Sequence, residues 1–274
     1  MIFLIAGCAW AGAKTANLFN NAPVIENIAY GILPHQKLDI YLPDQAEDGY
    51  FPVIVFYHGG RWTYGTKDEH AFVAETLTHY GFVVVIPDYA KYPQVRFPVF
   101  VEDSAKALVW VHSNIENHHG NSERLYISGH SAGAHIAALL AADPRYLKAE
   151  GAAPEIIKGF AGLAGPYQFT PDEPDLQAIF GPPENYPQMQ VPNFIDGDEP
   201  PMLLLQGLDD DVVNRSNIDR LEAKIREKGG TVESKFYPGV DHLWIVGALS
   251  WLGKGEAPVA QDMVEFFNTK RSEQ

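Results

Sequence analysis

Unbroken apolar runs alternate along the chain with amphipathic stretches. Pro52–Tyr57 and Phe82–Ile86 are apolar throughout, which is typical of parallel strands covered on both faces. The strand candidates are Val24–Tyr30, Lys37–Leu42, Val53–Tyr57, Phe82–Pro87, Leu125–Ser128, Ile157–Leu163, Met202–Gln206 and Val232–Tyr237. Helical spacing occurs between them, at Glu69–His79, Val99–Asn117, Ala132–Ala142, Asn217–Lys228 and Pro258–Asn268. This alternation predicts an α/β fold, a mostly parallel sheet of about eight strands with helices on both faces.

The segment 165–201 interrupts the alternation. It is rich in proline and aromatic residues, among them Pro166, Tyr167, Phe169, Phe180, Pro182, Pro183, Tyr186 and Pro187. A connection this long inside a compact domain is usually functional or disordered, and its aromatic content favours an ordered flap. We predict one domain over residues 23–274, with 165–201 inserted as a lid.

The strongest chemical motif is Gly129-His-Ser-Ala-Gly133. It follows an apolar run ending at Ser128 and precedes the alanine-rich stretch Ala134–Ala142, which is the strand–turn–helix context of a nucleophile elbow. The flanking positions must be small, and the serine hydroxyl lies at a helix N-terminus that favours developing negative charge. The motif predicts Ser131 as a nucleophile.

Three further groups, each at the end of a predicted strand, could act together with Ser131. His58-Gly-Gly-Arg-Trp62 follows an apolar strand; its two glycines could form an ordinary turn, but in α/β-hydrolases the same place supplies the backbone N–H groups of an oxyanion hole. The run Asp209-Asp-Asp211 follows another strand and offers three candidate acids, and His242 lies in a loop after the last strand. The order Ser, Asp, His along the chain is that of the α/β-hydrolases.

Together these motifs resemble the α/β-hydrolase superfamily, in particular its hormone-sensitive-lipase-like and feruloyl-esterase-like carboxylesterases. The segment 58–62 is similar to their His-Gly-Gly-Gly-Trp pattern, and Asp88-Tyr89 to their strand-end Asp-Tyr. The segment Gly129–Ile136 looks like the elbow of the branch that includes prenylcysteine methylesterases and arylformamidases. The resemblance extends from about Lys37 to about Phe267.

The resemblance also implies which aspartate acts. The family pattern of Gly207, Asp210 and Val213 favours Asp210 over Asp211, with Asp209 third. Two positions depart from the pattern: Arg61 replaces the third glycine, and Gln206 stands where histidine is frequent.

The expected reaction is ester hydrolysis through an acyl-enzyme, without a cofactor. His242 would act as the base, and the backbone N–H groups of Gly60, Arg61 and Ala132 would bind the oxyanion. Aromatic residues flank these motifs, namely Trp62, Tyr64, Tyr167, Phe169, Phe180 and Trp244. We expect Trp62, His130, Tyr167 and Trp244 to contact the substrate, a small-to-medium ester, although any single aromatic residue could instead be core packing.

Two classes of ligand are not expected. The formal net charge is −15, whereas nucleic-acid binding needs a cluster of basic side chains, so a nucleic acid is not an expected ligand. A metal site is not expected either, because His118 and His119 are adjacent rather than spaced along one helical face, and no His-Glu-x-x-His occurs.

The N-terminal segment, residues 1–22, has two interpretations. Met1–Trp10 is almost wholly apolar but shorter than a membrane-spanning helix, and Leu4–Cys8 resembles a bacterial lipobox. A lipidated Cys8 would attach the protein to a membrane; alternatively, the segment rests on the domain. A cytoplasmic and an envelope location both stay open, as does the oligomeric state. Cys8 is the only cysteine, so an internal disulfide is excluded.

Two rival functions stay open. The same catalytic machinery cleaves amides and formamides, so an arylformamidase or amidase is the first alternative. The second is a non-catalytic binding protein on the hydrolase fold, although such proteins typically lack the serine or the histidine, and both are present here.

Overall fold

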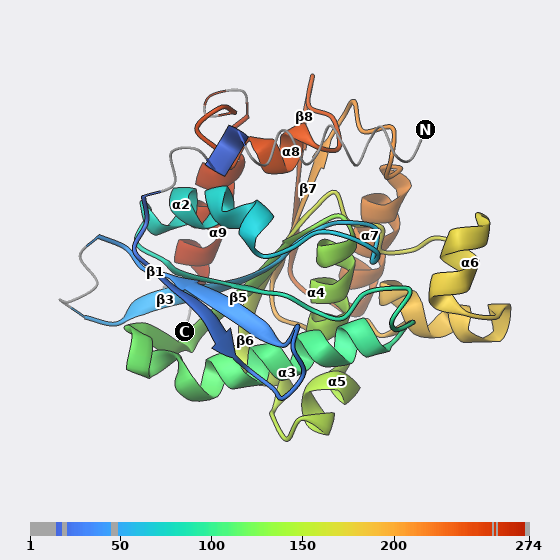
Figure 1. Cartoon of the computed structure of the whole chain (residues 1–274). Helices are drawn as coiled ribbons and strands as arrows, with labels where there is room; N and C mark the ends of the chain where they lie inside the picture. Colours follow the sequence, from blue (N-terminus) through green and yellow to red (C-terminus); the bar gives the residue numbers. More distant parts are fainter. Residues whose placement is uncertain (1–14, 18–20, 45–48, 254, 256, 272–274) are drawn as a thin grey trace.

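The computed structural model describes residues 15–17, 21–44, 49–253, 255 and 257–271. An eight-stranded sheet runs through it in the order β1-β2-β4-β3-β5-β6-β7-β8 (Figure 1). The β1–β2 and β2–β4 pairs are antiparallel, and the other neighbouring pairs are parallel. The strands are β1 Val24–Ala29, β2 Lys37–Tyr41, β3 Phe51–Tyr57, β4 Val83–Pro87, β5 Gly120–His130, β6 Ile157–Leu163, β7 Met202–Gly207 and β8 Val232–Tyr237. The predicted α/β fold is confirmed.

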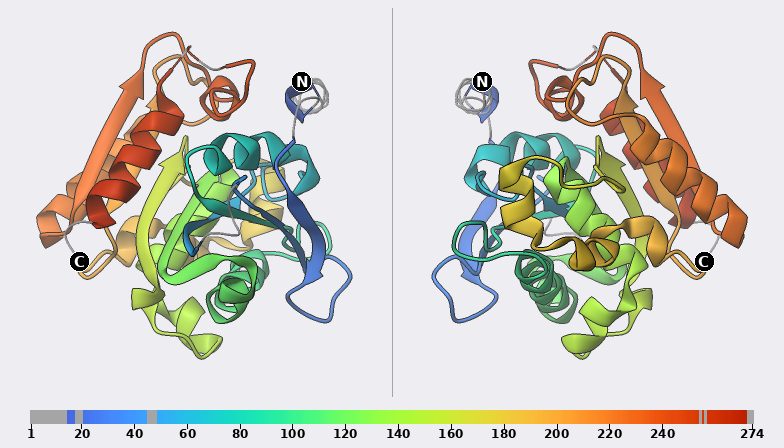
Figure 2. Two further views of the ribbon diagram at one scale, coloured as in Figure 1. Left: turned by 90° about the vertical axis from the view of Figure 1, so that its left-hand side faces the viewer. Right: turned by 90° about the vertical axis from the view of Figure 1, so that its right-hand side faces the viewer.

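Helices cover both faces of this sheet (Figures 1 and 2). They are α2 Ala71–Thr78, α3 Val99–Asn114, α4 Ala132–Ala142, α5 Pro144–Ala149, α6 Pro174–Phe180, α7 Ser216–Lys228, α8 Trp244–Gly247 and α9 Val259–Arg271. Alternate residues of β3 enter two separate cores, as a strand's two-residue period requires: Val53 and Val55 pack with α3, α4 and α7, while Ile54 and Phe56 pack with α2, α8 and α9. All four are fully buried, which explains the unbroken apolar run.

The largest difference from the predicted elements is in β5. The sequence predicted a strand over Leu125–Ser128, but β5 begins at Gly120, where it pairs with Phe51 of β3. Gly120 and Asn121 pair with Phe51 and Pro52, and the register shifts before Leu125 pairs with Val53. These added residues carry no apolar run, so their strand conformation comes from pairing with a neighbour and not from local hydrophobic periodicity.

Three short helices were not predicted. The segment 165–201 contains α6 and two 3-10 helices, Pro183–Met189 and Val191–Asn193. Helices α5 and α8 have only six and four residues, too few to show a helical period.

Within the described residues, no helix combines the length and the apolar character needed to cross a membrane. Cys8, and with it the predicted lipidation site, lies outside the described residues.

Candidate active site

The predicted functional residues meet at the carboxyl edge of the parallel strands. Ser131 follows β5, Asp210 follows β7, His242 follows β8, and the segment 58–62 follows β3. Parallel strands bring their carboxyl ends to one edge, so loops distant in sequence converge there.

The turn at Ser131 has the strained geometry of a nucleophile elbow. Ser131 has φ 54° and ψ −120°, which a residue with a side chain rarely adopts, and helix α4 begins at the next residue. A Cβ on Gly129 would lie 2.5 Å from the backbone of Gly133, and one on Gly133 would overlap the carbonyl oxygen of Tyr57. Both glycines are therefore required by the close approach of strand, turn and helix.

Ser131, His242 and Asp210 form a continuous chain of hydrogen bonds. Ser131 Oγ lies 2.9 Å from His242 Nε2, and His242 Nδ1 lies 2.9 Å from Asp210 Oδ2. Because a carboxylate only accepts, the proton of the neutral imidazole lies on Nδ1, which leaves Nε2 to accept the serine O–H. The His242 side chain is 9% exposed and that of Asp210 1%. The arrangement can deprotonate the serine and stabilise the resulting imidazolium.

Of the three candidate acids, only Asp210 contacts His242 in the described structure. Asp209 and Asp211 are exposed on either side of it.

The Asp210 carboxylate is held on both oxygens. Oδ1 accepts the backbone N–H groups of Val212 and Val213 at 2.9 and 2.8 Å, and Oδ2 accepts Gln206 Nε2 at 2.8 Å. Gln206 is buried and also donates to the Val213 carbonyl. The sequence marked Gln206 only as a departure from the family pattern; the structure makes it a support of the acid.

A second buried histidine, His130, contacts the loop that carries His242. His130 is buried, and its Nε2–H donates to the backbone carbonyl of His242 at 2.8 Å. Burial, together with the repulsion between two neighbouring imidazoles if both were protonated, holds the pKa of His130 well below its usual range, so this imidazole stays neutral. His130 was predicted to contact the substrate; its observed contact is with the loop that carries His242.

The loop after β3 has an unusual backbone. Gly60, Arg61 and Trp62 all have positive φ, at 125°, 50° and 59°. The Gly60 carbonyl accepts N–H groups of Thr63 and Tyr64 at 2.9 and 3.0 Å, which closes a tight turn. The preceding glycine, Gly59, lies against the elbow, since a Cβ there would be 3.4 Å from Ser131 Cβ. This turn therefore sits directly beside the nucleophile.

His58 has a structural position. It is fully buried, stacks on Tyr89 with ring centroids 4.4 Å apart, and its carbonyl accepts the Tyr89 hydroxyl at 2.7 Å. The strand-end tyrosine noted in the sequence thus anchors the start of the loop.

Aromatic side chains from the loop and from segment 165–201 pack together. Trp62 stacks on Phe169 at 5.7 Å between ring centroids and meets Phe180 edge-on at 4.8 Å. His135 of α4 joins them, 5.4 Å from Trp62. The sequence did not single out His135, which lies in the first turn of α4, four residues after Ser131.

The other predicted aromatic contacts divide into two kinds. Trp244 and Tyr64 are 46% and 40% exposed, and Trp244 begins α8 two residues after His242. Tyr167 is fully buried against Phe160, so it offers a substrate no accessible surface and is a packing residue. Tyr167 was predicted to contact the substrate; its observed contact is with Phe160 of the core.

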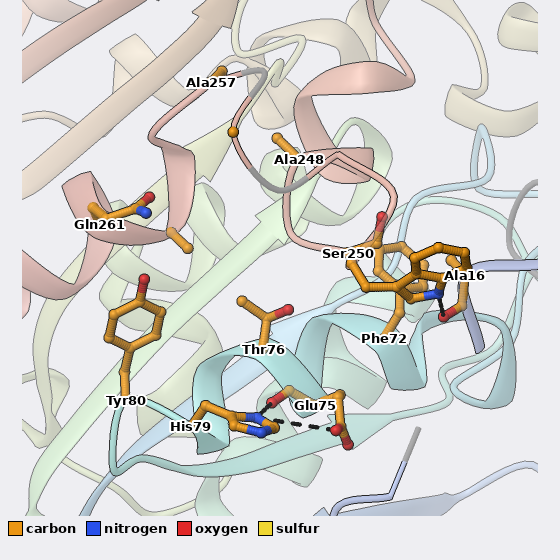
Figure 3. Close-up of a pocket in the computed structure, with 13 residues that line it drawn as sticks. Ala16, Phe72, Glu75, Thr76, His79, Tyr80, Ala248, Ser250, Ala257 and Gln261 are labelled. Carbon is orange, nitrogen blue, oxygen red and sulfur yellow. Dashed lines mark hydrogen bonds and ion pairs between the residues drawn. The ribbon is translucent and has the colours of Figure 1, made fainter. Parts of the chain in front are cut away.

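A separate cavity of about 290 Å³ lies between α2, α9 and the segment after α8 (Figure 3). Phe72, Tyr80, Trp251 and Gln261 are among its lining residues, and none of the residues described above is. Within the described ranges, no three histidine, cysteine or carboxylate side chains are grouped to hold a metal ion.

Comparison with known proteins identifies the family. The BD-FAE model matches residues 38–157, and the prolyl oligopeptidase family model matches residues 101–271. The chain is similar to isoprenylcysteine alpha-carbonyl methylesterase of Arabidopsis thaliana, 37% identical over 153 residues, covering 54% of this chain and 36% of that protein. It is also similar to kynurenine formamidase of Danio rerio, 35% identical over 114 residues, covering 42% of this chain and 37% of that protein.

These matches cover little more than a third of either curated relative. Among solved structures, esterase B of Lactobacillus rhamnosis, bound to a tributyrin phosphonate, superposes with a TM-score of 0.85 at 18% identity, covering 100% of this chain and 95% of that one. The chain therefore belongs to the prolyl oligopeptidase family, and its fold is that of the α/β-hydrolase esterases.

Proposed function

We propose that the protein is a serine carboxylesterase that hydrolyses small-to-medium esters through an acyl-enzyme on Ser131. The observation that carries this proposal is the pair of 2.9 Å contacts that link Ser131 through His242 to Asp210. The similarity to a methylesterase agrees with it.

In the proposed reaction, His242 Nε2 takes the serine proton as Oγ attacks the ester carbonyl. Asp210 keeps the imidazole in the required tautomer and stabilises its charged form. The backbone N–H groups of Gly60, Arg61 and Ala132 bind the oxyanion, each contributing about 3 kcal/mol to lowering the barrier. The alcohol leaves with the proton from His242, and water then hydrolyses the acyl-enzyme by the same route.

We further propose that segment 165–201 acts as the lid of the substrate pocket. Its Phe169 and Phe180 pack on Trp62, which belongs to the turn at residues 60–64 (the oxyanion turn), and this packing supports a wall of the acyl or alcohol pocket there.

The nucleophile is tested with a fluorophosphonate probe, read by intact mass and peptide mapping. Labelling is expected at Ser131 and should be lost in Ser131→Ala, together with turnover of short p-nitrophenyl esters. Folded wild-type protein that takes up no label would refute the proposal and favour a binding protein.

The acid is tested by two neighbouring substitutions. Asp210→Asn should lower kcat/KM by about 10⁴-fold, because the amide no longer holds the reactive imidazole tautomer. Asp211→Asn is the matched control and should stay near wild type, since this side chain is exposed. The reverse ranking would contradict the assignment.

A formamide hydrolase is the second candidate, favoured by the similarity to kynurenine formamidase. Labelling of Ser131 without ester turnover, but with hydrolysis of an N-formyl anilide, would favour it over the esterase.

A further inference from the structure

Arg61 occupies a place in the oxyanion turn where its backbone conformation disfavours a side chain. Its φ of 50° lies in the left-handed region, which glycine adopts without the steric cost that a Cβ brings. An arginine at this position therefore costs some stability relative to glycine, which directs attention to the contacts of its side chain.

That side chain extends from the turn to the start of helix α6. Its Nε donates to Asp175 Oδ2 at 2.9 Å and its Nη2 to Asp175 Oδ1 at 3.1 Å, a bidentate pair. The same Nη2 donates to Glu173 Oε2 at 2.7 Å. The contacts join residues 112 and 114 positions apart, so they fasten two separate parts of the chain.

Each group of this pair favours the charged form of the other. The hydrogen bond from Arg61 holds the pKa of Asp175 below its usual value, and the same bond raises the pKa of Arg61. The Arg61 side chain is 26% exposed and those of Asp175 and Glu173 are 38% and 54% exposed. Ion pairs this accessible contribute little to folding stability, so orientation is the effect to expect from them.

A second contact holds the other end of the helix. Phe180, the last residue of α6, lies edge-on to Trp62 with ring centroids 4.8 Å apart. Helix α6 is thus fastened at its first turn by Arg61 and at its last residue by Trp62, two consecutive residues of the oxyanion turn. These two contacts couple the position of the turn to that of the helix.

We propose that Arg61 is a positioning residue whose ion pairs with Asp175 and Glu173 tie the oxyanion turn to helix α6, so that lid position and oxyanion geometry are set together. This inference rests on the proposed function. The guanidinium itself does not bind the oxyanion; it acts through the backbone N–H groups of Gly60 and Arg61.

The test compares four variants with p-nitrophenyl butyrate as substrate. Arg61→Gly keeps a residue that tolerates the positive φ and removes the ion pairs with Asp175 and Glu173. Asp175→Asn weakens the same contact by removing the charge on helix α6. Each should lower kcat about tenfold, less than the loss of a whole oxyanion donor, while KM changes by less than about threefold. Arg61→Lys should recover part of kcat, because it keeps one charged contact. Glu227→Gln, which breaks the exposed ion pair with Lys224 on α7, is the matched control and should match wild type.

The double variant Arg61→Gly with Asp175→Asn should be no slower than either single variant, because both remove one interaction. A multiplicative loss would overturn the proposal, as would kcat values within twofold of wild type in both single variants. If Arg61→Gly fails to fold, Asp175→Asn decides alone, because it leaves the oxyanion turn untouched.

Hydrogen–deuterium exchange separates this inference from the proposed function. Exchange of the amides in residues 59–64 should be faster in Asp175→Asn than in wild type, whether or not the protein hydrolyses esters. Unchanged exchange would refute the proposal that the Arg61 ion pairs position the turn. Faster exchange in Asp175→Asn, if the wild-type protein neither reacts with fluorophosphonate nor hydrolyses esters, would refute the esterase proposal alone.

Discussion

The buried histidine below the nucleophile should make the stability of the protein depend on pH. His135 is fully buried on α4, one turn after Ser131, and its Nε2–H donates to the Met189 carbonyl at 2.8 Å. Its Nδ1 has no hydrogen-bond partner among the described residues, and the rings of Trp62 and Phe180 lie beside it. Protonation would place an unpaired N–H⁺ in this apolar environment.

Burial accordingly lowers the pKa of His135 from 6.5 to about 4, against a smaller opposing effect of the Met189 hydrogen bond. Between these two pH values the unfolded chain binds a proton that the folded protein refuses, so stability falls as pH falls. From pH 7 to pH 5 the loss from this one group is about 2 kcal/mol. His70, whose pKa burial lowers to about 3, adds a loss of the same sign.

Replacing His135 with glutamine isolates this contribution, because the glutamine amide can still donate to the Met189 carbonyl but does not titrate. Urea unfolding, followed by near-ultraviolet circular dichroism at pH 7 and pH 5, gives the free energy of unfolding of both proteins. The variant should lose about 2 kcal/mol less than wild type over this interval. His79→Gln, at a largely exposed histidine, controls for loss of an imidazole at the surface. An equal loss in wild type and His135→Gln would refute the reasoning.

Two further predictions concern the frame around the site. Gly133→Ala should lower the free energy of unfolding by about 3 kcal/mol or prevent folding, because its Cβ would overlap the Tyr57 carbonyl. Gly49→Ala, with no atom within 4 Å of the added Cβ, is the control. Equal melting temperatures of the two variants would contradict the packing argument. Lys67→Met should cost about 3–5 kcal/mol in urea unfolding, because it removes the cation 2.9 Å from Asp39, a carboxylate 3% exposed that keeps the Asn27 backbone N–H at 2.7 Å. A loss below about 1 kcal/mol would show that this carboxylate does not need the lysine charge.

The sequence by itself determined those elements whose apolar pattern can be recognised within a short stretch of the chain. The strand Ile157–Leu163, buried on both faces, and the alanine-rich helix Ala132–Ala142 have the predicted bounds, because each leaves a clear apolar pattern. The half-exposed edge strand Val232–Tyr237 has the predicted bounds as well. The elbow at Ser131 could also be recognised in the sequence, since the close approach of strand, turn and helix demands glycine at fixed positions on either side of the serine.

Only the tertiary structure decided what depends on distant neighbours. Three adjacent aspartates look alike in sequence, and the one that meets His242 is selected by where β7 and β8 end. Gln206 supports that acid and His135 lies below the serine, yet neither carries a local signal of its role. The same holds for Arg61, whose partners are more than a hundred residues away. Hydrophobic periodicity records which face of an element is buried, but not which element covers it, and that pairing is set by the packing of the whole sheet.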